Sequence, residues 1–252
     1  MKKRQILVLL NIALFAVLFI SIILNFILYK RGIQYYIDLN QTRLDPFQVS
    51  TYPPEAKPPK NPQALSKRVV FFGDSRVLSW PAPNLPNYEF INRGIGGQTS
   101  VQIKGRFDQH IRPLQPDIVV LQLGINDLKT IGLFPEKKAE IIANCRENIR
   151  EIVKKSQALG AVVIVTTIFP FGDIPITRQP LWSDDILPAV QEINAHIASL
   201  EDEGIIIFDS FSILADDRGM MPASYRIDEL HYNQRGYQKI NQEFTELFKT
   251  ID

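Results

Sequence analysis

The sequence predicts an α/β protein in which a five-stranded parallel sheet lies between layers of helices, preceded by one N-terminal transmembrane helix. Three observations support this. The chain of 252 residues starts with an uncharged apolar stretch, continues through a proline-rich segment, and then alternates short β-branched runs with longer amphipathic stretches. This length allows one full-sized domain and a small appendage.

The apolar stretch runs from Ile6 to Tyr29 and contains no charged residue. A helix of this length, at about 1.5 Å per residue, crosses a hydrocarbon core of about 30 Å. The basic residues 2–4 precede it, which favours a cytoplasmic N-terminus and places the rest of the chain outside the cytoplasm, periplasmic or extracellular. A cleaved signal peptide is the alternative, but residues 25–30 offer no A-x-A pattern of small residues. We therefore expect an uncleaved membrane anchor over residues 1–31.

Residues 32–66 form the expected linker, and residues 67–252 the expected soluble domain. The linker holds six of the prolines: Pro46, Pro53, Pro54, Pro58, Pro59 and Pro62. Dense proline favours the extended polyproline II conformation, which acts as a semi-rigid spacer. We expect this segment to hold the domain away from the membrane.

Five short runs in the domain read as buried strands: residues 68–72, 88–91, 117–123, 161–168 and 205–208. Helical patterns separate or follow them at residues 100–111, 136–159, 185–200 and 234–248. Strand–helix alternation at this spacing predicts parallel strands covered on both faces. Open sheets of this kind place their ligand site outside the carboxyl ends of the strands.

Composition excludes some functions. The formal net charge is +1 and the basic residues are scattered, which argues against nucleic acid as a partner. Cys145 is the single cysteine, so no intrachain disulfide can form. It shares a helical pattern with apolar residues, and we expect a buried structural thiol.

Four short segments carry the residue types of one active site. They are Gly73-Asp74-Ser75, Asn92 to Gly97, Gly124 to Asp127, and Asp228 to His231. The first three each follow an expected strand, so their side chains should meet at one edge of the sheet. Together they offer a nucleophile, donors to an oxyanion and a carboxylate–imidazole pair, which serine-based acyl transfer requires.

Ser75 is the candidate nucleophile, His231 its base and Asp228 the carboxylate that orients the imidazole. Taken singly, Asp74-Ser75 could only cap a helix, and the 228–231 segment could only be a turn before the last helix. The other histidines, His110 and His196, are expected to be surface or partly packed residues.

The expected oxyanion donors are the backbone N–H groups of Ser75 and Gly97 and the side-chain amide of Asn126. Asp127 is expected to orient loops. The glycines of the second segment lack the G-x-G-x-x-G spacing of a dinucleotide site. One histidine and no cysteine among Asp74, Asp127, Asp228 and His231 make a poor zinc site. We therefore expect no cofactor and no metal.

These four segments, in this order, resemble the four sequence blocks of the SGNH-hydrolase family, also called GDSL esterases and lipases. The resemblance covers residues 67 to 252. It implies a three-layer α/β/α sandwich like that of flavodoxin, and ester hydrolysis by Ser75, Gly97, Asn126, Asp228 and His231. Arg76 stands where the family name places leucine, and it could bind an anionic substrate or point into solvent. The α/β-hydrolase fold is a weaker match because Gly73 to Val77 lacks the final glycine of a G-x-S-x-G elbow.

The resulting hypothesis is a membrane-anchored serine esterase that hydrolyses carboxylic esters, either of acetylated sugars or of lipid and short acyl groups. Its partners would be that ester substrate and the lipid bilayer, and no nucleic acid. An acyltransferase that uses an envelope glycan as acceptor and a non-catalytic tethered binding domain are the alternatives. Residues expected to line the substrate site are Arg76, Trp80, Phe171, Arg178 and Trp182.

Overall fold

The computed structural model describes residues 2–53 and 66–251. The chain divides into two compact units, residues 1–48 and residues 49–252. We call the first the helical unit and the second the catalytic unit. Each is described by itself.

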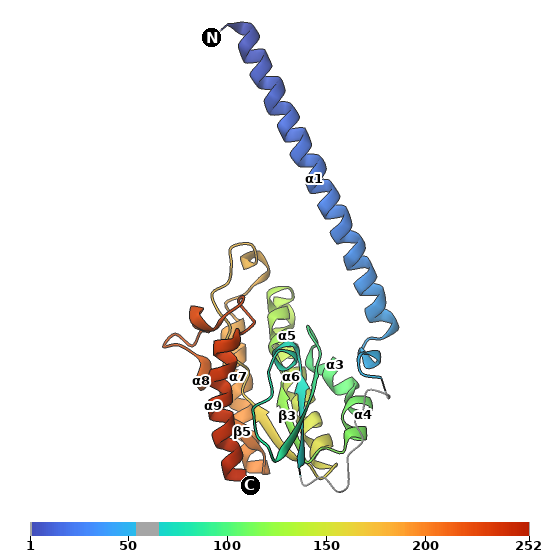
Figure 1. Cartoon of the computed structure of the whole chain (residues 1–252), viewed down its shortest axis with the longest axis vertical. Helices are drawn as coiled ribbons and strands as arrows, with labels where there is room; N and C mark the ends of the chain where they lie inside the picture. Colours follow the sequence, from blue (N-terminus) through green and yellow to red (C-terminus); the bar gives the residue numbers. More distant parts are fainter. Residues whose placement is uncertain (1, 54–65, 252) are drawn as a thin grey trace. The chain divides into compact units, whose positions relative to one another are not determined.

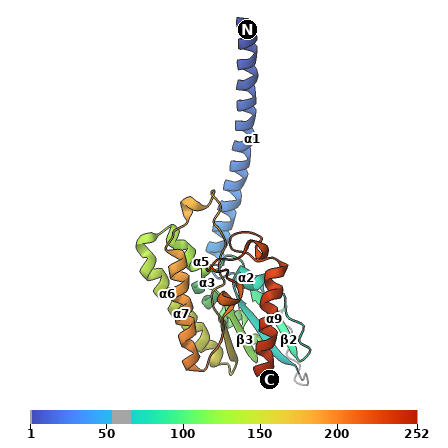
Figure 2. The same ribbon diagram turned by 90° about the vertical axis from the view of Figure 1, so that its left-hand side faces the viewer.

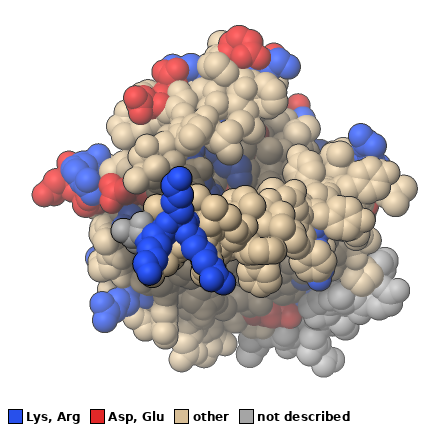
Figure 3. Space-filling view, turned by 90° about the horizontal axis from the view of Figure 1, so that it is seen from above, with Lys and Arg blue, Asp and Glu red and all other residues tan. Residues whose placement is uncertain are grey.

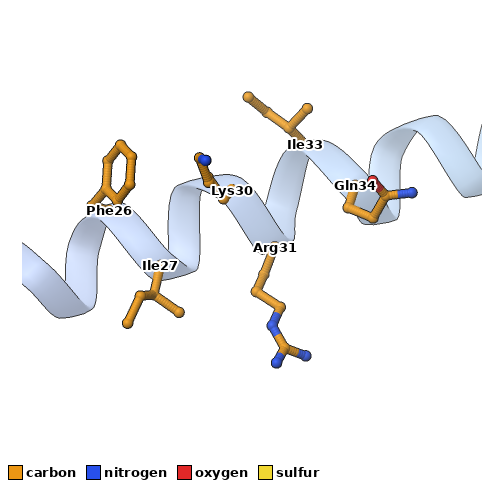
Figure 4. A pocket seen from close by; sticks show the side chains of 6 residues that line it. All are labelled: Phe26, Ile27, Lys30, Arg31, Ile33 and Gln34. Carbon is orange, nitrogen blue, oxygen red and sulfur yellow. The ribbon is translucent and has the colours of Figure 1, made fainter.

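The helical unit consists of the long helix α1, Lys3–Leu44, whose side chains are all unburied within the structure. An 18-residue window of α1 reaches a mean hydropathy of 3.0, so α1 is a candidate membrane span. Lys30 and Arg31, which follow the apolar stretch, project from opposite sides of the helix (Figure 4). The helix extends beyond the expected anchor end at residue 31 and stops at Leu44, because Pro46 disfavours helical backbone at Asp45.

The catalytic unit contains a five-stranded sheet in the order β2-β1-β3-β4-β5, and all strand pairs are parallel. The strands are β1 Lys67–Gly73, β2 Tyr88–Gly94, β3 Ile118–Gln122, β4 Val162–Thr166 and β5 Ile206–Phe208. All five coincide with the expected runs to within two residues or so, except that β2 extends to Gly94. This is the flavodoxin-like order, in which the direction of winding reverses between β1 and β3.

Helices cover both faces of the sheet, as expected. They are α2 Ser75–Leu78, α3 Ser100–Gly105, α4 Phe107–His110, α5 Ile125–Leu128, α6 Lys138–Gln157, α7 Ile186–Ser199, α8 Ser210–Leu214 and α9 Gln234–Ile251. Short 3-10 turns join them: η1 Val49–Thr51, η3 Arg112–Leu114, η4 Lys129–Gly132, η5 Pro135–Lys137, η6 Gln179–Leu181, η7 Leu200–Glu203 and η8 Ala223–Tyr225. Figures 1 and 2 show α6 and α7 on one side of the sheet and α9 on the other.

Side chains on the two faces of β1 pack into two separate hydrophobic cores, because successive side chains of a strand point to opposite faces. Val70 and Phe72 pack in the core under α3, α6 and α7. Val69 and Phe71 pack with α2, α8 and α9. Cys145 is fully buried in the first core, which confirms the structural thiol.

The helix expected over residues 100–111 is broken at Arg106, which lies between α3 and α4. The Arg106 side chain is completely buried and hydrogen-bonds to backbone carbonyls of the sheet edge. The expectation for His110 is wrong: its side chain is fully buried, and its Nε2 lies 2.8 Å from the carbonyl of Val49. His196 is partly exposed, as expected.

Residues 49–53 belong to the catalytic unit. The Tyr52 hydroxyl donates a 2.6 Å hydrogen bond to the carbonyl of Gly94, and its ring packs edge-on against His110. The guanidinium of Arg93 lies 4.6 Å from the centre of the same ring. Most of the prolines expected to form the spacer fall in residues 54–65, outside the described residues, and both flanks of that segment lie in the catalytic unit.

Charged residues of both signs are spread over the surface. Figure 3 shows small groups of charged side chains of both signs around the rim, and one group of basic side chains near the centre of the view.

Candidate active site

The nucleophile candidate lies at the reversal point of the sheet. Ser75 begins α2 directly after β1, and Asn126 lies in α5 directly after the neighbouring strand β3. The turn at Gly73 requires glycine, because a Cβ there would lie 1.9 Å from the carbonyl oxygen of Gln122. Asp74 caps α2 by accepting a hydrogen bond from the backbone N–H of Arg76.

Ser75, His231 and Asp228 form a continuous hydrogen-bonded chain. The Ser75 Oγ lies 3.0 Å from the His231 Nε2, across 156 positions of sequence. The His231 Nδ1 lies 2.8 Å from the Asp228 Oδ2. With Nδ1–H donating to the carboxylate, the Nε2 lone pair faces the serine hydroxyl and can accept its proton.

The carboxylate of Asp228 is held in its charged form. Partial burial acts to raise its pKa, but hydrogen bonds from the imidazole of His231 and from the backbone N–H groups of Leu230 and His231 outweigh burial and lower the pKa. Its side chain remains 40% exposed. A charged carboxylate at this place stabilises an imidazolium when His231 takes a proton.

Two of the expected oxyanion donors, Asn126 and Gly97, come from segments other than that of Ser75. Asn126 is buried, and its Nδ2 donates one hydrogen to the carbonyl of Gln98 at 2.9 Å. An amide nitrogen carries a second hydrogen, which remains for an oxyanion. Gly97 has a positive φ of 74° on an exposed loop, and a Cβ on its neighbour Gly96 would lie 3.9 Å from the Cβ of Ser75. The loop that carries Gly96 and Gly97 therefore passes close to Ser75.

Arg76 neither binds substrate nor points into solvent in this structure. Its side chain is completely buried, and its guanidinium donates to the carbonyls of Phe169 at 2.6 Å, Leu230 at 3.1 Å and Pro170 at 3.4 Å. Leu230 immediately precedes His231, so Arg76 connects the nucleophile helix to the loop that carries the base. Both alternatives expected from the sequence are replaced by this positioning role.

A second buried guanidinium, that of Arg106, holds the loop that carries Gly97, which we call the oxyanion side of Ser75. Arg106 donates to the carbonyls of Gly73 at 2.8 Å and Arg93 at 2.9 Å, and to the Gln98 side chain at 2.5 Å. Its plane lies 4.4 Å from the ring centre of Phe72. Burial lowers the pKa of Arg106 to about 9, so it stays protonated at neutral pH. It joins the ends of β1 and β2 to the loop that carries Gly97.

Asp127 connects α5 to α3. Its carboxylate accepts from the backbone N–H of Ser100 at 2.8 Å and from the Ser100 hydroxyl at 2.6 Å. Asn148 donates to the same hydroxyl at 3.0 Å. Burial raises the pKa of Asp127 to about 6 despite these hydrogen bonds. Its place, turned toward α3, fits the expected role in orienting loops.

The residues expected to line a substrate site divide into two groups. Trp80 and Phe171 are buried: the Trp80 Nε1 donates to Asn241 at 2.7 Å, and Phe171 packs against Trp182. Arg178 and Trp182 instead line a surface pocket beside Leu230. The structure thus places only the latter two beside the catalytic loop.

Within residues 2–53 and 66–251, no group of three or more His, Cys, Asp or Glu side chains is arranged to hold a metal ion. The carboxylates of Asp74, Asp127 and Asp228 are each turned to separate partners.

A parallel α/β sandwich with a hydroxyl, an imidazole and a carboxylate joined in sequence at its carboxyl edge defines a class of protein, the hydrolases of acyl groups. A sequence model of the GDSL-like lipase/acylhydrolase family matches residues 71–239, and the chain belongs to this family of ester-hydrolysing enzymes. None of the curated protein sequences matches the chain.

Solved structures share the fold. A proposed acylhydrolase from Bacteroides fragilis is 25% identical, with a TM-score of 0.63 over 81% of this chain and 93% of its own. A GDSL-like lipase from Bacteroides thetaiotaomicron is 24% identical, with a TM-score of 0.66 over 82% of this chain and 99% of its own. A variant of an acetyl xylan esterase from Geobacillus stearothermophilus is 17% identical, with a TM-score of 0.55 over 73% and 96%.

Sequence reasoning missed Arg106, Gln98 and Tyr52. Arg106 follows the buried Ile103 by three residues and so lies on the buried face of the helical pattern, which was a usable signal. Gln98 and Tyr52 carry no such signal, because their roles depend on contacts with residues brought close only by the fold.

Proposed function

We propose that this chain is a membrane-anchored serine esterase that hydrolyses carboxylic esters through an acyl-serine intermediate. The single observation that supports it most is the hydrogen-bonded chain from Asp228 through His231 to Ser75. These groups come from the two ends of the catalytic unit, and a purely structural role would not need a partly exposed imidazole between them.

In the first half-reaction the Ser75 Oγ attacks the ester carbonyl while its proton moves to the His231 Nε2. The carbonyl oxygen becomes an oxyanion facing the N–H groups of Ser75 and Gly97 and the side-chain amide of Asn126. When the tetrahedral intermediate collapses, the bond to the alcohol oxygen breaks and His231 protonates that oxygen. The products of this half are the free alcohol and an acyl group on Ser75.

In the second half-reaction water replaces the alcohol. His231 takes a proton from the water as its oxygen attacks the acyl carbonyl, and the same donors face the oxyanion. Collapse breaks the bond to Ser75, which recovers its proton from His231. Each donor of this kind contributes about 10²–10³-fold in rate in related chemistry.

Acetylated sugars and lipid or short acyl esters remain the proposed substrates. The acetyl xylan esterase among the structural neighbours acts, by its name, on acetylated xylan; at 17% identity it supports the fold and no more for this chain. An acyltransferase would share the acyl-serine intermediate and differ in the acceptor. Product analysis with and without a glycan acceptor separates transfer from hydrolysis.

The anchor proposal rests on the apolar, uncovered α1 and on the basic residues that precede it. We propose that the N-terminus is cytoplasmic and that the catalytic unit lies outside the cytoplasm. Single cysteines can be introduced at Lys3 or at Lys154 in a Cys145→Ser background. Labelling of each cysteine by a membrane-impermeant thiol reagent then shows on which side of the membrane it lies. Labelling of the residue 3 cysteine in intact cells would contradict this orientation.

A fluorophosphonate probe tests the nucleophile directly. The wild-type chain should take up one probe on Ser75, and Ser75→Ala should take up none. His231→Ala should react far more slowly while keeping the same melting temperature to within a few degrees. Equal labelling of the wild type and Ser75→Ala would refute the proposal.

A further inference from the structure

A pocket of about 240 Å³ lies beside the catalytic loop. It is lined by Lys129, Leu133, Arg178, Leu181, Trp182 and Leu230. Three segments contribute: η4 with the residue after it, the loop that follows β4, and the segment from Asp228 to His231. The last two lie side by side, since the Gly172 N–H donates to the Glu229 carbonyl at 2.8 Å (Figure 1).

Two lining residues connect this pocket to the reacting groups. Lys129 follows Asn126 by three residues in a continuous helical turn, so both side chains leave the same face of that turn. Leu230 directly precedes His231. The pocket therefore adjoins the space between the oxyanion donor and the base, where part of a bound ester must lie.

The charges at the pocket do not cancel. Arg178 forms an ion pair with Glu229, whose side chain is only 3% exposed. Among the described residues, Lys129 has neither an ion pair nor a side-chain hydrogen bond, although it is partly buried. Burial lowers the pKa of Lys129, and the charged groups that also act on it are the buried Asp74, then Arg178, Arg76 and Glu229.

A partly desolvated cation without a partner costs free energy, which an anion bound beside it would offset. The remaining walls are apolar, from Leu133, Leu181, Trp182 and Leu230. The volume equals that of about eight water molecules, so it suits a small acidic group on a short apolar stem. A long acyl chain would not fit within it.

Building on the proposed esterase function, we propose that this pocket binds an acidic group of the substrate, so that the preferred esters carry a carboxylate or phosphate a few bonds from the scissile carbonyl. Lys129 supplies the unpaired charge, and the Arg178–Glu229 pair forms the opposite rim. The acidic group can belong to the acyl part or to the alcohol part, and the test includes both.

The test compares matched anionic and neutral esters on the full-length protein in detergent. The acyl pair is mono-4-nitrophenyl adipate against 4-nitrophenyl heptanoate, and the alcohol pair is 3-acetoxybenzoate against 3-acetoxybenzamide. For the wild type, at least one pair should show a higher kcat/KM for the anionic ester. Lys129→Gln should lower that ratio about 10-fold or more, and Lys129→Glu should lower it further.

Lys154→Gln is the matched control, because Lys154 is an exposed lysine on α6 outside the pocket. It should leave both rates unchanged. A wild type that turns over both pairs in a Ser75-dependent way without preferring either anion would overturn the pocket proposal and keep the esterase. So would a preference that Lys129→Gln leaves intact. Turnover that survives Ser75→Ala would instead overturn the proposed function on which this inference rests.

Discussion

The two sides of the nucleophile are each held by a buried arginine, and they are held differently. On the acid–base side, Arg76 bonds the carbonyl of Leu230, 154 positions away in sequence. On the oxyanion side, Arg106 bonds Gln98 and the Arg93 carbonyl, which are 8 and 13 positions away. The segment that carries His231 is thus positioned by a contact that exists only in the complete fold. The loop that carries Gly97 is instead held mainly by residues close to it in sequence.

The two sides of Ser75 also have different chemical tasks. In the proposed mechanism the acid–base side transfers protons and needs a defined tautomer of His231, while the oxyanion side needs only donors at a set distance. Removing one part from each side should therefore reduce the rate to different extents.

The largest effect is expected for Asp228→Asn. An amide cannot hold the Nδ1–H tautomer in the same way, so the Nε2 no longer accepts the proton of Ser75. We expect kcat to fall about 10⁴-fold. Stopped ester assays with a fluorescent leaving group measure this, and circular dichroism verifies the fold. A loss below tenfold would show that Asp228 is not the orienting carboxylate.

Asn126→Ala should cost less. It removes one of three oxyanion donors, so kcat should fall about 10²–10³-fold with little change in KM. Asn126→Asp serves as a comparison, because it keeps the size and places a repelling charge at the oxyanion. A rise in KM with unchanged kcat would indicate a ground-state binding role instead.

The carboxylates of the two sides should respond oppositely to pH. Burial raises the pKa of Asp127 to about 6, above the 3.8 of a free aspartate, so between these pH values the native state binds more protons than the unfolded state. Stability contributed by the protonated Asp127 is thus lost as pH rises from about 4 to 6, by about 3 kcal/mol at most. For Asp228 the lowered pKa gives stability that is lost as pH falls.

Urea unfolding of the wild type and Asp127→Asn at several pH values measures the first effect. The difference in unfolding free energy between the two should shift in favour of the variant as pH rises through this window. A difference that does not change with pH would contradict the raised pKa.

Arg76→Lys and Arg106→Lys should each lower kcat about 10–100-fold through misplacement of a neighbouring group. Double-mutant cycles distinguish the two sides. Arg76→Lys should add little to Asp228→Asn, since both disturb the base, but should add fully to Asn126→Ala. Arg106→Lys should show the reverse pattern. Full additivity in every pair would refute the division of roles.

The smallest effect is expected for Tyr52→Phe. Losing the hydroxyl bond to the Gly94 carbonyl should reduce stability by about 1 kcal/mol and leave the catalytic residues in place. Thermal unfolding of the catalytic unit measures this. An unchanged melting temperature would mean that the Tyr52 hydroxyl adds nothing to stability.

Residue patterns along the chain were enough to predict the parallel sheet, because continuous β-branched runs and amphipathic helices are local signals. They also predicted that Ser75 and Asn126 share one sheet edge. They could not predict that Arg76 is buried, because three carbonyls from the loops after β4 and β5 satisfy its guanidinium. Long-range backbone acceptors leave no trace in composition or spacing.

Trp80 illustrates the same limit. A tryptophan soon after the nucleophile resembles a substrate contact, but its ring packs against Phe71 and Phe244 in the core below α9. Arg178 and Trp182 lie instead in the exposed loop after β4. There, an aromatic and a basic residue indicated a pocket correctly, whereas Trp80 did not.

Because Tyr52 packs on the catalytic unit, the connection from that unit to the proposed membrane anchor is shorter than the proline pattern predicts. The residues on both flanks of positions 54–65 belong to the catalytic unit, so residues inserted there would not lengthen the connection to α1. Only Asp45 to Gln48 lie between α1 and the catalytic unit, and residues added there would lengthen the connection between the two.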